Sequence, residues 1–526
     1  MSTRPSWPNW RLGGSPMRRA WTPDQVRACE TPLLDAGQGD ALMSRAAAGL
    51  ANVCATELRE RYGHVYGSRV LALVGKGNNG GDALFAACRL ARRGAHVTVL
   101  LCAGRAHPAG LRAVRALNID VRELDESDDD VLRFLLCAHL VIDGIAGTGA
   151  RAGLPDRLGE LVRRWRGRKP GRQLVVAVDV PSGVDAGTGQ TGGSAIAADV
   201  TVTFAGLKTG LLIPPAARNA GRVEVVDIGL ELADEQAVVL AVEASDVAAL
   251  WPAPEPSDHK YSRGVLGLVA GSARYPGAAV LAADAAVSAG VGMLRYVGPD
   301  TPGGLIAQRS PEVVAGAGRV QAWALGSGVA PDEESQVDAI RAALDEAIET
   351  QLPCVLDAGA FDLIYGPLGM PAILTPHAGE LATLLGRLSG TIVSREEIEA
   401  DPARHAKSVA EAANAVVLLK GAHTVISQPA GPDYVQGPAT AWLATAGSGD
   451  VLTGVLGALA ATAGRKSLPQ LAELAALGSF VHGQAALLAS QGGPLRSLHV
   501  AAAVKYAVTE LRVRAREEKN VGQWQL

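Results

Sequence analysis

The stretch LALVGKGNNGGD, residues 71–82, runs from an apolar segment directly into a turn that contains four glycines. The apolar segment has the pattern of a buried strand, and residues 82–93 have the pattern of a helix. A glycine-rich turn between a strand and a helix leaves backbone N–H groups exposed at the positive end of the helix dipole. The stretch therefore predicts an α/β fold in which the turn binds an anionic group.

This turn lacks the Lys-Ser/Thr ending of a Walker A loop, and taken alone it is equally compatible with a simple tight turn. Asn78, Asn79 and Asp82 add side-chain oxygens that a turn does not require, and these oxygens favour a ligand site. An alternative interpretation of Asp82 is that it caps the helix that follows.

Apolar, β-rich segments alternate with helix-length segments on both sides of this stretch, which predicts parallel sheets covered on both faces. In the first half we expect strands at residues 70–74, 96–101, 140–142, 174–178, 200–204 and 223–227, with helices at 82–93 and 154–165. In the second half we expect strands at residues 265–270, 294–297, 322–325, 354–357, 372–375, 415–420 and 424–427, with helices at 278–289 and after 449.

The segment WPAPEPSDHKYSRG, residues 251–264, is rich in proline and polar residues, which is typical of a boundary between domains. A chain of 526 residues is also too long for one ordinary core. We therefore expect two α/β domains. The expected divisions are a flexible extension at 1–16, a first domain at 17–230, a linker at 231–258 and a second domain at 259–526.

The composition excludes several classes of protein. With 48% apolar and 19% charged residues the chain is globular, and a net charge of -4 with 4% aromatic residues argues against a nucleic-acid partner. The six cysteines include no Cys-x-x-Cys pair and indicate reduced thiols. The N-terminus has no secretory pattern, and no apolar run reaches the length of a membrane span, so we expect a cytoplasmic protein without membrane contact.

Three further loops of the first half follow predicted strand ends, at residues 143–149, 179–185 and 204–210. In an open parallel sheet such loops converge on one crevice with the glycine-rich turn. Each loop alone could be only a turn. Together they direct the oxygens of Asn79, Asp143, Asp179 and Ser182 inward, and this set favours a polar ligand or a hard cation.

In the second half the motif TAGSGD, residues 445–450, precedes an apolar segment that reads as a helix. Gly447 to Gly449 would present backbone N–H groups to a transferring phosphoryl group at the helix N-terminus. Asp450 is placed to take a proton from an attacking hydroxyl. The alternative is that Asp450 is only a charge that favours the helix dipole.

Two other strand ends of the second half carry polar residues. KGAHT, residues 420–424, supplies a cation and a turn that suit nucleotide phosphates, although an ordinary surface lysine would look the same. TPHAGE, residues 375–380, places His377 and Glu380 three positions apart, a spacing that also fits a capped helix start. This spacing alone does not indicate a metal site.

The first-half motifs GNNGGD, DGIAGTG and DVPSG together resemble the YjeF N-terminal family of NAD(P)H-hydrate epimerases, over residues 17–230. The resemblance implies a Rossmann-like doubly wound sheet. It implies a potassium ion held by Asn79, Asp143 and Ser182, and a contact of Asp179 near the reacting ring, where our hypothesis is that its carboxylate acts as the acid-base group. It also implies substrate contacts from Asn78, Asn79, Gly80, Gly81, Asp82, Gly147, Thr148, Gly149, Ala150, Arg151, Ala152, Gly153 and Asp179.

This chain departs from the epimerase pattern at two positions. The family often has glycine where Ala83 stands and phenylalanine where Ala146 stands. Both changes concern packing near the loops and leave the polar groups in place.

The second-half motifs HKYSRG, YPGAA, LGSGV, TPHAGE, KGAHT and AGSGD resemble the YjeF C-terminal family of NAD(P)H-hydrate dehydratases. The resemblance covers residues 259–514 and implies a ribokinase-like α/β/α sandwich with Asp450 as the catalytic base. It implies substrate contacts from Ala278, Gly328, His377 and Asp450, and nucleotide contacts from Lys420, Gly421, Ala422, His423, Thr424 and Gly449.

The joint resemblance implies repair of hydrated nicotinamide nucleotides, NADHX and NADPHX. One half would interconvert the R and S epimers. The other would dehydrate the S form with conversion of ADP to AMP and phosphate, assisted by Mg²⁺, in a homo-oligomer. A small-molecule kinase with an accessory N-terminal nucleotide-binding domain remains an alternative, as does a first half that binds without catalysis.

Overall fold

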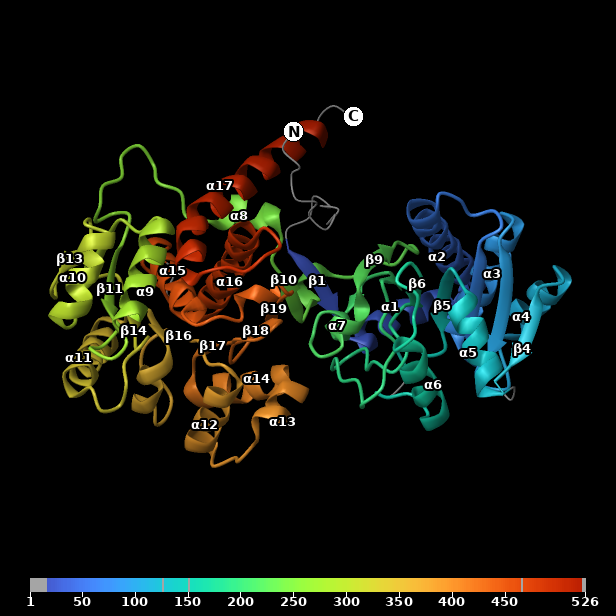
Figure 1. The fold of residues 1–526 in the computed structure, drawn as a ribbon, viewed down its shortest axis with the longest axis horizontal. Coiled ribbons are helices and arrows are strands. Elements are labelled where there is room, and N and C mark those ends of the chain that lie inside the picture. Colours follow the sequence, from blue (N-terminus) through green and yellow to red (C-terminus); the bar gives the residue numbers. More distant parts are fainter. Residues whose placement is uncertain (1–16, 125–126, 150–151, 465–466, 523–526) are drawn as a thin grey trace. The chain divides into compact units, whose positions relative to one another are not determined.

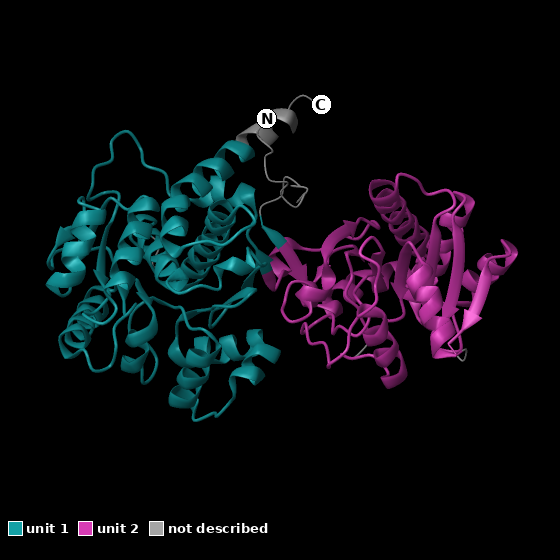
Figure 2. Cartoon of the chain, viewed as in Figure 1, with its two compact units in different colours: residues 1–18, 240–526 teal, residues 19–239 magenta. Residues whose placement is uncertain are grey.

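The computed structural model describes residues 17–124, 127–149, 152–464 and 467–522. The chain divides into two compact units (Figure 2). Residues 19–239 form the N-terminal unit, and residues 240–526, with the segment that precedes residue 19, form the C-terminal unit. The extension expected at residues 1–16 lies outside the described residues.

The N-terminal unit is built on a sheet of seven strands in the order β4-β3-β2-β5-β6-β7-β9, whose neighbours are all parallel. The chain runs from β2 toward β4 on one side and then restarts at β5 on the other, so the strand order reverses between β2 and β5. The strands are β2 (Arg69–Val74), β3 (His96–Leu101), β4 (Asp120–Glu123), β5 (Leu140–Gly144), β6 (Leu174–Val178), β7 (Val200–Phe204) and β9 (Arg222–Val226).

Alternate residues of β2 face two different cores. Val70, Ala72 and Val74 pack with helices α2 and α3, whereas Leu71 and Leu73 pack with α5 and α6. Helices therefore cover both faces of the sheet, as the apolar strands predicted. The helices of this unit are α1 (Pro23–Asp35), α2 (Gly39–Tyr62), α3 (Asn78–Arg92), α4 (Pro108–Ala116), α5 (Asp128–Cys137), α6 (Asp156–Arg166) and α7 (Ala217–Ala220), and the short strands β1 (Arg18–Trp21) and β8 (Leu207–Lys208) pair in parallel.

Helix α3 begins at Asn78, four residues before the start that we expected at residue 82. The glycines of the motif explain the difference. A Cβ on Gly80 would lie 2.2 Å from the carbonyl oxygen of Gly75, so glycine lets the first helical turn pack directly on the preceding turn. Gly77 is the N-cap, and Asp82 therefore lies inside the helix and does not cap it.

The C-terminal unit contains a second, mostly parallel sheet in the order β13-β12-β11-β14-β15-β16-β17-β18-β19-β10 (Figure 1). Strand β18 is antiparallel to both of its neighbours, β17 and β19. The strands are β10 (Val239–Ala241), β11 (Val265–Val269), β12 (Met293–Tyr296), β13 (Val314–Ala315), β14 (Ala322–Leu325), β15 (Cys354–Leu356), β16 (Ala372–Leu374), β17 (Val416–Leu419), β18 (Thr424–Ser427) and β19 (Asp433–Gln436).

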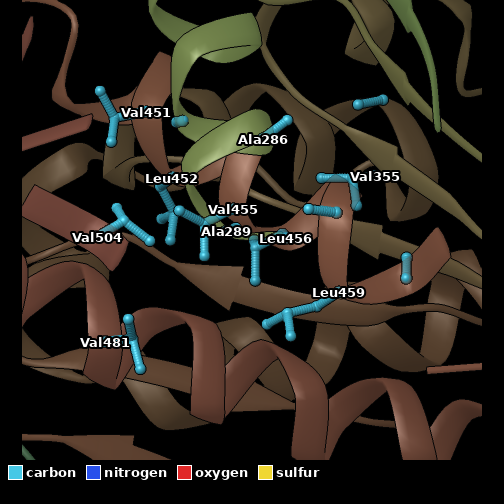
Figure 3. Close-up of a cluster of buried hydrophobic side chains, with 14 of the residues drawn as sticks. Ala286, Ala289, Val355, Val451, Leu452, Val455, Leu456, Leu459, Val481 and Val504 are labelled. Atoms are coloured by element: carbon cyan, nitrogen blue, oxygen red, sulfur yellow. The ribbon is translucent and has the colours of Figure 1, made fainter. Parts of the chain in front are cut away.

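The largest core of this unit lies between one face of the sheet and helices α9, α15 and α16, and Figure 3 shows some of its aliphatic side chains. Helices α11 and α14 contact the strands as well, and α12 packs on α14. This is an α/β/α arrangement. The helices are α8 (Ala244–Leu250), α9 (Pro276–Ser288), α10 (Asp300–Arg309), α11 (Glu334–Thr350), α12 (Ala378–Ser389), α13 (Arg395–Ala400), α14 (Pro402–Ala413), α15 (Ser448–Thr462), α16 (Leu468–Ser490) and α17 (Ser497–Gly522).

Helix α16 is long and apolar enough to cross a membrane by composition. In the structure 61% of its apolar window is buried inside the unit. It contacts α15, α17 and β19, and this packing accounts for its apolar composition.

Residues 231–258, which we expected to be a linker, contain ordered elements. Strand β10 belongs to a sheet, and α8 packs on α17. Val247 is fully buried and Trp251 is 6% exposed, so these apolar side chains anchor a segment whose prolines and charges suggested a connection.

Candidate functional site

The four loops of interest in the N-terminal unit follow the neighbouring strands β2, β5, β6 and β7 at the same sheet edge. The amide of Gly75 donates to the carbonyl of Gly144 at 3.0 Å, and that of Gly153 donates to the carbonyl of Gly183 at 2.8 Å. The structure therefore brings these loops together at the point where the strand order reverses, which is where open α/β sheets bind ligands.

Asp143 lies at this edge with its side chain fully buried. Its carboxylate accepts hydrogen bonds from the Ser182 hydroxyl at 2.5 Å and from the Ser182 amide at 2.7 Å. Burial raises the pKa of Asp143 to about 6, although the bonds from Ser182 oppose that rise. A buried carboxylate is stabilised by a cation, so the pair suits a metal ion with oxygen ligands.

Asn79 lies in the first turn of α3 and is oriented by its own side-chain amide. Its Nδ2 donates to the carbonyls of Val178 at 2.7 Å and Ala146 at 3.3 Å, so its Oδ1 is the atom left to accept or ligate. A Cβ on Gly147 would lie 2.4 Å from that Oδ1. Gly147 is therefore required for the close approach of the two loops.

Asp179 forms a buried ion pair with Lys208, a residue that sequence reasoning did not single out. Asp179 Oδ1 accepts from Lys208 Nζ at 2.5 Å and from the Thr203 hydroxyl at 3.0 Å. Lys208 also donates to the carbonyl of Phe204 at 2.9 Å, and its side chain is 3% exposed. The backbone of Asp179 has a φ of 66°, a strained value for a non-glycine residue and typical of functional sites.

Asp82 is 6% exposed and belongs to the same polar cluster. Burial, together with the negative charges of Asp179 and Glu30, raises its pKa well above the usual value. Glu30 lies on α1. The sequence did not indicate it as a site residue, because it belongs to no recognised motif.

The remaining positions expected to bind the substrate of this unit lie in two segments. Asn78, Gly80 and Gly81 form the first turn of α3, while Thr148, Gly149, Ala152 and Gly153 follow β5. Ala150 and Arg151 lie outside the described residues.

In the C-terminal unit a buried carboxylate, Asp357, connects several strand ends. Its Oδ1 accepts from Lys420 Nζ and from the Thr375 hydroxyl, both at 2.9 Å. Its Oδ2 accepts from the hydroxyls of Ser327 at 3.0 Å and Thr453 at 3.2 Å. Burial would raise the pKa of Asp357, but Lys420 and these hydroxyls outweigh burial and hold the pKa below its usual value.

Asp357 was not predicted as a site residue. The sequence did contain one signal, since an aspartate ends the apolar strand expected at residues 354–357. A strand-end aspartate alone does not indicate that four side chains donate to its carboxylate. It also does not indicate that one of these donors is Lys420, which was predicted as a site residue.

Asp450 lies in the first turn of α15, where the sequence placed it. Burial raises its pKa to about 6, the charge of Asp357 adds to the rise, and the neighbouring Ser327 hydroxyl and the charge of Lys420 oppose it. Gly447 is the N-cap with a φ of 86°, and a Cβ on Gly449 would lie 3.5 Å from Lys420 Nζ. The structure therefore brings Asp450, Lys420 and the glycine turn together.

The glycine turn is supported from behind by α17 and α9. The Ser497 hydroxyl donates to the carbonyl of Ala446 at 2.6 Å, and a Cβ on Gly447 would lie 2.4 Å from a methyl group of Leu281. Because a trans peptide points its C=O and N–H in opposite directions, holding the Ala446 carbonyl against Ser497 turns the Gly447 N–H away from α17.

His377 caps α12 and is mostly exposed. Its Nδ1 accepts from the amides of Gly379 and Glu380, and its own amide donates to Glu380 Oε2 at 2.8 Å. This is the capped helix start that its spacing allowed. His377 also forms a parallel bridge with Lys420, and the Lys420 amide donates to the carbonyl of Pro376 at 2.8 Å.

The other expected contact positions of this unit fall at neighbouring strand ends. Ala278 lies in the first turn of α9, and its Cβ would be 2.4 Å from a Cβ on Gly328, whose φ is 67°. Gly421, Ala422 and His423 join β17 to β18, which begins at Thr424, and the first two are exposed.

Comparison with known proteins matches both units. The family described as YjeF-related protein N-terminus matches residues 39–210, and the family described as NAD(P)H-hydrate dehydratase matches residues 266–505. A bifunctional NAD(P)H-hydrate repair enzyme Nnr of Mycobacterium tuberculosis is 43% identical over 459 residues, which covers 85% of this chain and 90% of the relative. The bifunctional NAD(P)H-hydrate repair enzyme Nnr of Mycobacterium leprae is 42% identical over 492 residues, which covers 91% of this chain and 96% of the relative.

Among solved structures, an ADP/ATP-dependent NAD(P)H-hydrate dehydratase from Bacillus subtilis, co-crystallised with ATP/Mg²⁺, is 28% identical. It covers 51% of this chain and 97% of its own, with a TM-score of 0.44. The identity and coverage of the mycobacterial relatives are decisive, and this chain belongs to the family of bifunctional NAD(P)H-hydrate repair enzymes.

Proposed function

We propose that the two units catalyse consecutive steps in the repair of hydrated nicotinamide nucleotides. The N-terminal unit interconverts the R and S epimers of NADHX and NADPHX. The C-terminal unit dehydrates the S form to NADH or NADPH and converts ADP to AMP and phosphate. The observation that carries this proposal is the placement of Asp450, with a pKa near 6, beside Lys420 at the N-terminus of α15.

In the C-terminal unit, Asp450 takes the proton from the C6 hydroxyl of the hydrate as that oxygen attacks the terminal phosphoryl group of ADP. Lys420 and the backbone amides of the glycine turn stabilise the charge that develops on the phosphoryl oxygens. The C6–O bond then breaks, phosphate leaves, and loss of a proton from C5 restores the dihydropyridine. Phosphate leaves readily where hydroxide does not, which explains why a phosphoryl-transfer site serves a dehydratase.

The nucleotide would lie along Lys420–Thr424 and Gly449, and the hydrate along Ala278, Gly328 and His377. Magnesium would accompany the nucleotide phosphates and screen their charge. Among the described residues no group of three or more His, Cys, Asp or Glu side chains could hold a metal by itself, so the phosphates would supply a share of its ligands.

In the N-terminal unit, the hydroxyl-bearing C6 lies beside the ring nitrogen, so a proton transfer is enough to start the loss of stereochemistry. Asp179 would act at this carbon as an acid-base group. Asn79 Oδ1, Asp143 and Ser182 would hold a potassium ion, because Asp143 is a fully buried carboxylate and the Gly147 close approach leaves Asn79 Oδ1 without a covering Cβ.

One assay tests both steps. The full-length protein is incubated with a mixture of R and S NADHX, K⁺, Mg²⁺ and either ADP or ATP, and the absorbance of reduced nicotinamide is followed. Recovery of both epimers with ADP is expected. Recovery of only the S fraction would eliminate the epimerase step, and no recovery with either nucleotide would eliminate the dehydratase step. Light scattering of the same preparation tests the proposed homo-oligomer.

A further inference from the structure

Three carboxyl groups and one lysine meet in the N-terminal unit. Asp179 and Lys208 form the buried pair, the charges of Asp179 and Glu30 act on Asp82, and the charges of Asp179, Lys208 and Arg27 act on Glu30. With these groups and Arg27 ionised, the three carboxylates outnumber the two cations, so the cluster would carry an excess negative charge in a largely buried place. Such a cluster retains a proton, because burying an uncompensated carboxylate costs several kcal/mol.

The retained proton is assigned by the hydrogen bonds that each carboxyl group receives. Asp179 accepts from Lys208 Nζ at 2.5 Å and from the Thr203 hydroxyl at 3.0 Å, and these donors stabilise its ionised form. Asp82 is 6% exposed, and among the described residues no group donates to its buried Oδ1. An ionised Asp82 would therefore be a buried charge without a donor at that oxygen, whereas a protonated Asp82 would not.

We propose that Asp82 is the proton donor of the epimerase site and that Asp179, fixed by Lys208, is its ionised counterpart. The inference rests on the proposed epimerase function and assigns to Asp82 a chemical step beyond substrate contact. Two carboxyl groups whose surroundings favour opposite protonation states are the arrangement that separates an acid from a base in one site.

The charged and titratable neighbours of Asp82 agree with this assignment. Asp179 and Glu30 both raise the pKa of Asp82, in addition to burial, and burial is also the largest influence that raises the pKa of Glu30. Lys208 and Arg27 oppose the rise at Glu30, but neither is among the influences on Asp82.

The elements packed on α3 bring further groups near the motif. Two side chains lie close to Gly81: His107, at the start of α4, and Met43 of α2. Each is about 3 Å from where a Gly81 Cβ would stand. On β5, the Asp143 carboxylate accepts a hydrogen bond from the Ser182 amide. His107 accepts from the amide of Gly110 through Nδ1, which directs that nitrogen toward its own helix.

The proposed epimerisation takes place at C6 of the hydrate. Asp82 donates its proton to the C6 hydroxyl, the C6–O bond breaks, water leaves, and the lone pair of N1 forms the C6–N1 double bond of an iminium ion. Water adds to the opposite face of C6 and loses a proton to Asp179. That proton returns to Asp82 within the cluster, which restores both carboxyl groups and leaves the other epimer.

The test uses the full-length protein, with conversion of R-NADHX in the presence of ADP as the epimerase readout and conversion of S-NADHX as the control. Asp82→Asn should lower epimerisation about 100-fold, whereas conversion of the S form stays at the wild-type rate. Asp82→Glu, which keeps the carboxyl group, should recover part of the activity. A D82N rate within threefold of wild type, with the S form converted normally, would overturn the proposal.

Two measurements do not depend on the variant remaining active. Epimerisation by the wild type should fall as the pH rises through the pKa of Asp82, because the ionised carboxylate has no proton to give. A rate that stays level as the pH rises until the protein unfolds would overturn the assignment. Infrared spectroscopy of the wild type near neutral pH should show a protonated carboxyl band that is absent from D82N. A band that is unchanged in D82N would also overturn the assignment of the proton to Asp82.

Failure of the proposed function has a different signature. A wild-type protein that converts S-NADHX and never R-NADHX would not be an epimerase. A wild-type protein that converts both, with D82N as active as wild type, would be an epimerase with another proton donor.

Discussion

Replacing Lys420 with methionine should destabilise the C-terminal unit by about 3 kcal/mol at pH 7.5, because it leaves the carboxylate of Asp357 buried without its cation. The Asp357 side chain is 4% exposed, and Lys420 Nζ lies 2.9 Å from its Oδ1. Removing one partner of a buried pair typically costs about 3–5 kcal/mol. The lower end applies here, since the hydroxyls of Ser327, Thr375 and Thr453 continue to donate to the carboxylate.

The pH dependence of this loss has a defined sign. In the wild type the pKa of Asp357 is held below its usual value, so the pair stabilises the fold above the unfolded pKa and the stabilisation is lost as the pH falls through the folded pKa. Without Lys420, burial dominates and raises the pKa of Asp357. The difference in unfolding free energy between wild type and K420M should therefore be largest at neutral pH and shrink toward pH 5.

Differential scanning calorimetry at pH 5, 6 and 7.5 measures this, with Lys505→Met as the control because Lys505 is exposed on α17. K505M should change the unfolding free energy by about 0.5 kcal/mol or less. The double variant K420M with Asp357→Asn should recover part of the loss, since it removes the orphaned charge. A K420M effect below about 1 kcal/mol, or one that does not vary with pH, would show that Lys420 does not compensate the buried charge of Asp357.

Three further changes test the sites. Asp450→Asn should lower dehydration of the S form about 100-fold or more, and wild-type dehydration should fall below pH 6 as Asp450, with a pKa of about 6, becomes protonated. Ser497→Ala should lower the dehydratase kcat about tenfold with little change in KM for the nucleotide, because it frees the Ala446 carbonyl. Gly147→Ala should raise the K⁺ concentration needed for epimerisation, because its Cβ would displace Asn79 Oδ1.

Each of these expectations has a matched control. Epimerisation should be unaffected in D450N, and a D450N protein that still dehydrates the S form would remove Asp450 from the mechanism. Ser497→Thr keeps the hydroxyl and should restore the kcat that S497A loses; equal losses in both variants would argue against a positioning role. A Gly147→Ala protein with an unchanged K⁺ response would show that Asn79 does not bind the ion.

The sequence by itself determined the α/β class of both units and the loops at their ligand-binding edges. Apolar strands such as residues 70–74 alternate with helices, and this pattern depends only on which residues must be buried. Motif glycines also identified the places of close approach. The GNNGGD and AGSGD motifs both lie where the structure starts a helix from a strand-end turn, and Asp450 lies in the helical turn expected for it.

Only the tertiary structure decided which charges meet. Asp357 and Lys420 are 63 positions apart, and Asp179 and Lys208 are 29 apart, so no local pattern connects them. It also decided that α3 starts at Asn78, since that start depends on contact between Gly80 and Gly75, and that residues 239–250 are ordered, since their burial depends on α17. Strand and helix periodicity is a property of neighbouring residues, whereas the protonation of Asp82 or Asp450 depends on distant segments that folding brings to one sheet edge.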